Sequence, residues 1–339
     1  METLLAIARR NKKEVSMASD EKDLNNCRIC TLLSLHLKKT YEGCSKVKSG
    51  GAGSRLKSWE CCHSAFLEKK DKNLTDEDID FLALNLAFYL ASWGMYRGSS
   101  FLLDRDYKAH RKVVSICMER QYALLWDYEP NPYNLRIAAT LLFGDGSKEN
   151  DLGLVSRIRK AYGQEDVKAS SEDSIMDDLE EEGSRSSADN AGVPTETLIT
   201  KILLGVFACI PAFDRYFSEA YKCLCVSEGK KGLLKLDRNT FLSIGALAID
   251  HRSCLWYYCQ DVFYPAMKCL DLALWRMGLC DEMVKTLENP SKDAKAKKDP
   301  KKMWGRLRKL GYCDKDDSCG TATLIQIRKE YLPEKENKK

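Results

Sequence analysis

The sequence has little net charge and no long apolar run. Its 54 basic and 50 acidic residues leave a formal net charge of +4, which argues against a nucleic-acid binder that is basic over its whole surface and leaves a local basic patch open. The longest uncharged run, from Phe81 to Tyr96, is shorter than the roughly 20 residues of a membrane-spanning helix. The start, Met1–Arg10, lacks the apolar core of a signal peptide. We therefore expect a soluble, cytoplasmic protein with no membrane contact.

Several nucleotide-binding and catalytic motifs are also missing. The chain has no Gly-x-x-x-x-Gly-Lys-Ser/Thr phosphate loop and no glycine pattern for a dinucleotide, so ATPase and NAD-dependent activities are disfavoured. Only four histidines are present, and none lies in a nucleophile elbow or beside a signature cysteine. We expect no cofactor, and these absences leave open whether the protein is an enzyme.

Cysteine, by contrast, is abundant. Fifteen scattered cysteines, an odd number, do not form the pattern of an extracellular disulfide framework and indicate a reducing compartment. Cys27-x-x-Cys30 together with Cys44, Cys61, Cys62 and His63 superficially suggests a zinc site. A structural zinc site usually takes two close ligand pairs presented from turns, whereas Cys61 and Cys62 are adjacent within a helical pattern. We therefore expect no bound metal, and cysteines that act mostly as small buried apolar residues.

Alternating β-branched runs bounded by turns are almost absent, whereas helical periods are long. These patterns predict an all-α fold, a compact and irregular multi-helix domain. Thr75 and Asp78 form a capping-box pattern at the start of a helix over Ile79 to about Trp93. That helix is apolar on nearly every face, so we expect it to lie deep in the core. Another helix is expected from Lys108 to Asp127.

Changes of composition divide the chain into five segments. Residues 164–192 are dominated by acidic residues and serines, which predicts a disordered acidic insertion. This insertion separates the two halves of the helical core, 75–163 and 193–290. An N-terminal helical segment, 1–74, contains a flexible Gly/Ser link at 49–54. A basic C-terminal segment covers 291–339.

The stretch from Thr195 to Phe217 holds the strongest candidate for chemistry. It is an apolar helix with one internal charge, Lys201, which breaks at Pro211 and restarts at Asp214. Burial would lower the pKa of Lys201 and favour its neutral, nucleophilic amine, while Asp214 occupies a position suited to a helix N-cap. The two would then form a catalytic pair across the break. The alternative is that Lys201 extends to water and Asp214 only caps its helix.

A second candidate is the string that follows the predicted buried helix. Trp93 and Arg97, placed around a glycine, can line a pocket for a flat or anionic ligand. The alternative is that Arg97 hydrogen-bonds the carbonyls at a helix C-terminus. The leading functional hypothesis is therefore a ligand pocket near the Lys201/Asp214 corner, with Trp93, Arg97 and Arg215 as its ligand-binding residues.

Four strings resemble a bacterial family of uncharacterised helical proteins. They are residues 88–100, 200–205, 210–217 and 264–268. They cover the core of the chain and leave out its N-terminal segment, acidic insertion and basic tail. The resemblance implies a bacterial protein with an all-helical fold.

The order of Lys201, Pro211 and Asp214 is also similar to that in helix-hairpin-helix DNA glycosylases. In that family a lysine forms a Schiff base with the sugar after base loss, and a downstream aspartate starts the next helix. The resemblance implies DNA binding or DNA repair as the alternative function. This chain has a shorter lysine–aspartate spacing than the usual enzymes, lacks a hairpin of the Leu-Pro-Gly-Val-Gly type and has no cluster cysteines after it.

The basic segment from Lys292 to Lys309 would supply the nucleic-acid contact in this alternative. The segment includes Trp304, and its lysines can contact a phosphate backbone. A lysine-rich, solvated surface is the competing interpretation.

Overall fold

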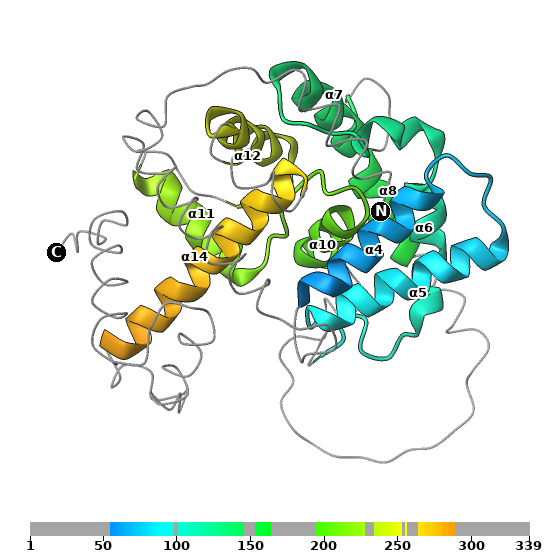
Figure 1. Ribbon diagram of the computed structural model, residues 1–339, viewed down its shortest axis with the longest axis horizontal. Helices are drawn as coiled ribbons and strands as arrows, with labels where there is room; N and C mark the ends of the chain where they lie inside the picture. Colours follow the sequence, from blue (N-terminus) through cyan, green and yellow to red (C-terminus); the bar gives the residue numbers. More distant parts are fainter. Residues whose placement is uncertain are drawn as a thin grey trace, which may run out of the picture. The chain divides into compact units, whose positions relative to one another are not determined.

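The computed structural model describes residues 55–97, 101–145, 153–163, 194–227, 234–252, 255 and 264–288 (Figure 1). Within these ranges the chain forms helices and contains no β-strand, which confirms the all-α prediction. No helix in these ranges is long and apolar enough to cross a membrane. The N-terminal cysteine pair, the predicted acidic insertion and the basic segment from Lys292 to Lys309 lie outside the described residues.

The described residues fall into two compact units. The first unit holds those up to Ile210 together with Leu236–Leu242, and the second holds those of Pro211–Lys235 and from Ser243 onwards. The elements of the first unit are α4 (Arg55–Lys69), α5 (Asp76–Ser92), η1 (Tyr107–His110), α6 (Arg111–Cys117), η2 (Arg120–Leu125), α7 (Pro132–Phe143), α8 (Leu154–Gly163) and α10 (Glu196–Val206). The second unit holds α11 (Arg215–Ser227) and α14 (Ala266–Glu288), and α12 (Arg238–Asp250) has residues in both.

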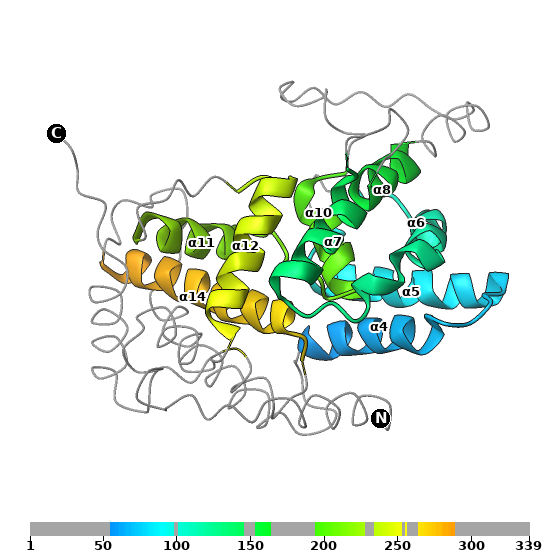
Figure 2. The same cartoon turned by 90° about the horizontal axis from the view of Figure 1, so that it is seen from above.

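Helices α4 and α5 lie side by side and are joined by a short turn (Figure 2). The predicted capping box begins α5: the Thr75 hydroxyl accepts the Asp78 N–H at 3.2 Å, and the Asp78 carboxylate accepts the Thr75 N–H at 3.0 Å. The Lys69 amine at the end of α4 lies 2.5 Å from the same carboxylate. This hydrogen bond, with those from Thr75, lowers the pKa of Asp78 to about 2. The turn is therefore fixed by one carboxylate that binds both helices.

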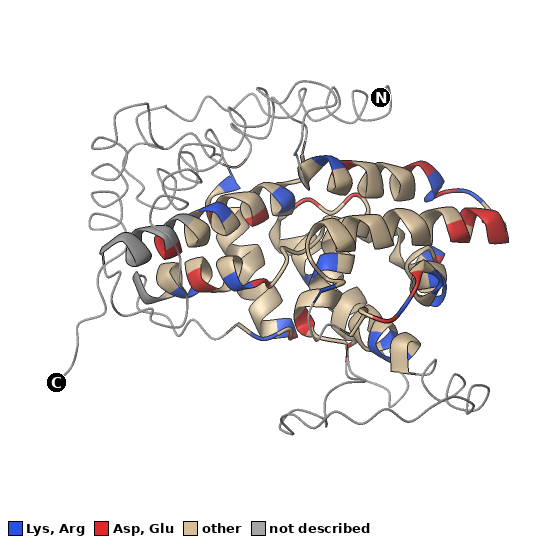
Figure 3. Ribbon diagram, turned by 90° about the horizontal axis from the view of Figure 1, so that it is seen from below, with Lys and Arg blue, Asp and Glu red and all other residues tan. Residues whose placement is uncertain are grey.

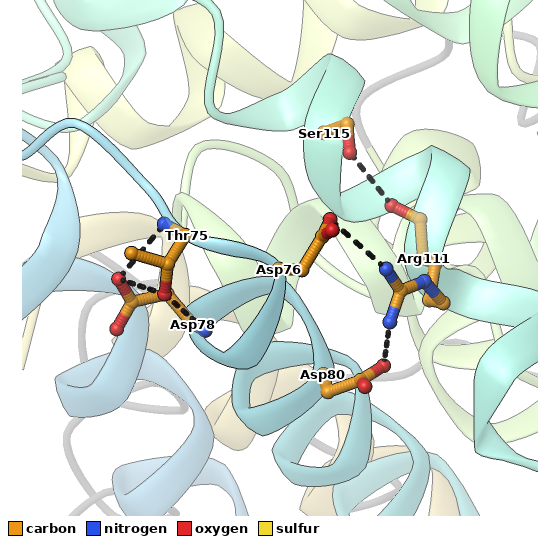
Figure 4. Close-up of polar contacts among 6 residues, drawn as sticks. All are labelled: Thr75, Asp76, Asp78, Asp80, Arg111 and Ser115. Atoms are coloured by element: carbon orange, nitrogen blue, oxygen red, sulfur yellow. Dashed lines mark hydrogen bonds and ion pairs between the residues drawn. The ribbon is translucent and has the colours of Figure 1, made fainter.

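Arg111, the first residue of α6, connects that helix to the first turns of α5 (Figure 4). Its guanidinium donates to Asp80 and, at 3.2 Å, to Asp76. The Arg111 carbonyl accepts the Ser115 hydroxyl at 3.1 Å. Asp76, in the first turn of α5, also meets the positive end of the helix dipole. The start of α5 is thus held from two sides, by α4 and by α6.

Helix α10 is buried on all sides after its first turn. Every residue from Leu198 to Ile210 is shielded from solvent, and α10 packs against α4, α5 and α8. The Thr195 side chain caps it by accepting the Leu198 N–H at 3.2 Å. Gly205 lets α5 approach closely, because a Cβ at this position would lie 2.6 Å from a ring carbon of Tyr89. A glycine is therefore required where α10 meets α5.

In the second unit, α11 packs along α14. Gly278 permits the contact, because a Cβ there would lie 2.0 Å from the backbone oxygen of Tyr216. A buried ion pair lies on α14, where the Lys268 amine is 2.8 Å from Asp271. The second carboxylate oxygen of Asp271 accepts the Ala212 N–H at 3.0 Å. The opposite charges of Lys268 and Asp271 offset the cost of burying each other. The contact with Ala212 also fixes the backbone just before α11.

Two sequence predictions for the first unit are wrong in part. The apolar helix α5 does not lie in the core on every face, because Phe81, Leu84 and Phe88 are 50%, 53% and 59% exposed. Its neighbours α4, α10, η1 and α6 cover the opposite side. The single helix expected from Lys108 to Asp127 is instead η1, α6 and η2 in succession. The break falls at Glu119, whose backbone is extended and whose carboxylate binds Arg157.

Candidate functional site

The side chain of Lys201 crosses from α10 to the end of α5. Lys201 is only 4% exposed, and its amine donates to the carbonyl of Trp93 at 3.1 Å. The amine also lies 5.5 Å from the centroid of the Trp93 ring, within cation–π range. Trp93 is the C-cap residue of α5, where a helix presents unpaired carbonyls and the negative end of its dipole. The buried amine placed there gives a carbonyl at the end of α5 a hydrogen-bond donor.

The next residues form a turn that Arg97 covers. Gly94 has φ +79°, a backbone conformation that favours glycine. The exposed Arg97 side chain folds over it, so that a Cβ on Gly94 would lie 2.4 Å from a guanidinium nitrogen. The structure therefore brings Trp93, Lys201 and Arg97 to one end of α5. The predicted ligand-binding role of Trp93 and Arg97 stays a prediction.

Asp214 and Arg215 lie in the second unit, whereas Lys201 lies in the first. Helix α10 ends at Val206 and α11 begins at Arg215, so the break predicted at Pro211 falls between them. The Asp214 carboxylate accepts the backbone N–H groups of the second and third residues of α11, each at 3.1 Å, which confirms its N-cap position. The Arg215 guanidinium binds Glu282 at 2.8 Å. Their predicted catalytic and ligand-binding roles stay predictions.

A buried histidine, which sequence reasoning did not single out, joins the turn after α5 to α8. His110 is fully buried, with Nε2 2.7 Å from the Tyr96 hydroxyl and Nδ1 2.6 Å from the Tyr162 hydroxyl. A neutral imidazole donates from one nitrogen and accepts at the other, so the two tyrosines take opposite roles. Burial lowers the pKa of His110 to about 4 and raises that of Tyr96 to about 12. His110 and Tyr96 are therefore both uncharged at neutral pH.

Trp59 and His63, on α4, bind the C-terminal carbonyls of α10. Trp59 donates its indole N–H to the carbonyl of Leu204 at 2.9 Å, and His63 Nδ1 lies 2.9 Å from that of Val206. The two rings stack with centroids 5.0 Å apart. These contacts supply partners for the end of a helix that water cannot reach.

Three of the described cysteines, Cys62, Cys117 and Cys209, are fully buried. No group of three or more His, Cys, Asp or Glu residues in the described ranges is placed to hold a metal ion. Burial raises the pKa of the Cys62 and Cys117 thiols well above the usual range, and that of Cys209 to about 12. Protonated thiols of this kind are weak nucleophiles at neutral pH.

Comparison with protein-family models, with curated proteins and with solved structures finds no match to this chain. The resemblances to a bacterial helical family and to helix-hairpin-helix glycosylases stay predictions. A Schiff-base role for Lys201 can be tested by borohydride trapping on DNA that contains abasic sites.

We expect Lys201→Met to lower the free energy of unfolding by about 1–3 kcal/mol, because it leaves the Trp93 carbonyl without its charged donor. Chemical denaturation measures the change. Lys160→Met is the matched control: Lys160 is exposed on α8, so its loss should change stability by less than about 0.5 kcal/mol. Equal stability of Lys201→Met and wild type would show that the buried amine does not anchor the end of α5.

We expect His110 to make the protein less stable as pH falls from 6.5 to 4. Folded His110 has a pKa of about 4, below its ordinary value of 6.5, so the unfolded chain binds more protons across this interval and stability rises with pH. The full effect is on the order of 3 kcal/mol. Denaturant unfolding of wild type and His110→Gln at several pH values measures it. The variant should have the flatter profile, and parallel profiles would contradict the assignment.

Proposed function

We propose that the first unit is a helical protein-interaction module. Its binding surface is the exposed side of α5 formed by Phe81, Leu84 and Phe88, here called the α5 face. Each of these large apolar side chains is at least half exposed. The proposal rests on this single observation, since grouped exposed apolar residues mark interaction sites more often than isolated ones do.

The three side chains form one stripe because they lie three and four residues apart along the helix. This spacing is the one by which an amphipathic helix presents its anchors to a partner. Half-exposed side chains of this size present roughly 100 Å² each. At about 25 cal/mol per Å², burying the stripe would contribute at most roughly 7 kcal/mol before the costs of association.

The α5 face belongs to a helix that is firmly held on its other side. Leu82, Leu86 and Leu90 are fully buried, and the capping box and Arg111 fix the start of the helix. The end is held by Lys201. A face presented from a fixed helix loses little conformational freedom on binding, which favours association.

Charge is confined to the N-terminal end of α5. Figure 3 shows acidic residues gathered there and uncharged residues along the rest of the helix. An uncharged centre with charge at its rim is the composition found at protein–protein interfaces.

The contacts that Lys201 and Trp93 make support a structural role for these two residues more directly than a ligand pocket, because the partners lie within the chain itself.

The proposal can be tested by photo-crosslinking in cells that naturally produce the protein. A variant with p-benzoylphenylalanine in place of Phe88 should give discrete, higher-mass protein adducts on irradiation. The same replacement at Tyr133, which is 73% exposed on α7, is the matched control and should give none of these adducts. No adduct specific to position 88 would contradict the proposed function.

A further inference from the structure

We infer that the α5 face binds the α5 face of a second copy of this chain, with the two helices antiparallel. The inference rests on the proposed function and names its partner. It follows from the order of side chains along the face and from the charges at its ends.

The exposed apolar residues of α5 are spaced nearly evenly about Leu84. Phe81 lies three residues before it and Phe88 four residues after it, which is the same separation of one helical turn on either side. A two-fold axis beside Leu84, midway between residues 84 and 85, therefore places Phe81 of one copy against Phe88 of the other, twice. Leu84 meets its own equivalent at the axis. A face that is complementary to itself is what a two-fold dimer requires.

The positions outside the stripe also fit this arrangement. Glu77 and Ala91 are both exposed and lie seven residues before and after Leu84. The same axis brings Glu77 of one copy close to Ala91 of the other, within one residue of exact opposition, and the small Ala91 side chain leaves room for the longer one. If position 91 held a large apolar residue, the Glu77 carboxylate of the other copy would lie against apolar surface that the dimer buries, which is unfavourable.

The ends of α5 favour the antiparallel direction. The side chains of Asp76 and Glu77 are exposed at the N-terminal end, and Arg97 is exposed just after the C-terminal end. An antiparallel pair brings the acidic end of one copy to the basic end of the other and opposes the two helix dipoles. A parallel pair would place the acidic residues of the two copies together.

The size of the face sets the strength of the dimer. Its three side chains offer roughly 300 Å² per copy, well below the roughly 800 Å² per partner of a stable interface. We therefore expect a weak, reversible dimer whose population rises with concentration.

Sedimentation velocity of the purified full chain, at concentrations up to the millimolar range, tests the inference. Wild type should shift towards the dimer as concentration rises. Phe81→Lys and Phe88→Glu, each alone, should stay monomeric, because a charge would be buried against a phenylalanine. The double variant Phe81→Lys/Phe88→Glu should dimerise again, since each lysine then meets a glutamate. An equimolar mixture of the two single variants should likewise form a heterodimer.

Leu124→Glu is the matched control. Leu124 is well exposed on η2, outside the α5 face, so this substitution should leave the dimer unchanged. Circular dichroism checks that each variant is folded. We expect all of them to fold, because the substituted positions are exposed. A wild type that stays monomeric, single variants that still dimerise, or a double variant that stays monomeric would each overturn the inference. If wild type is monomeric while position 88 crosslinks a different protein in cells, the second copy is excluded and the proposed function stands.

Discussion

The burial of α10 from Leu198 to its C-terminal end is the constraint on which the rest of the first unit depends. A helix without contact to water must find partners inside the protein for its terminal carbonyls and for any charge that it carries. Trp59 and His63 bind the carbonyls of Leu204 and Val206, which fixes α4 against the end of α10. The charge of Lys201 is directed to the end of α5. The polar requirements of one buried helix therefore position both members of the α4–α5 pair.

This arrangement also determines which side of α5 is left exposed. Gly205 brings α10 against Tyr89, and α4, η1 and α6 cover the remaining inner surface. The hydrogen-bonded chain of Tyr96, His110 and Tyr162 then joins the turn after α5 to α8. With its start, its end and one side fixed, α5 presents its outer apolar residues as a rigid stripe. The proposed interaction surface is thus a consequence of how the core satisfies its polar groups.

Local features could be predicted from the sequence, whereas features that depend on distant parts of the chain could not. The caps at Thr75 and Asp214 use neighbouring residues, so a short pattern was sufficient to find them. The role of His110 depends on Tyr162, 52 residues away. A local sequence pattern cannot predict a contact between residues so far apart in the chain. The exposure of Phe88 was missed because an apolar helix does not reveal how many neighbours surround it. The same limit applies to Lys201: its burial was one of two alternatives that the sequence left open, and its partner Trp93 was not foreseen.

Native-state hydrogen exchange of α10 tests the central claim most directly, because it reports how much of the unit must open before these amides meet water. The account predicts that the amides from Leu203 to Val206 exchange only through global unfolding, with the same free energy as chemical denaturation. The amides around Lys160, on the exposed side of α8, should exchange faster. Exchange of the α10 amides as fast as those of α8 would show that α10 opens independently, and would contradict its role as the helix that positions α4 and α5.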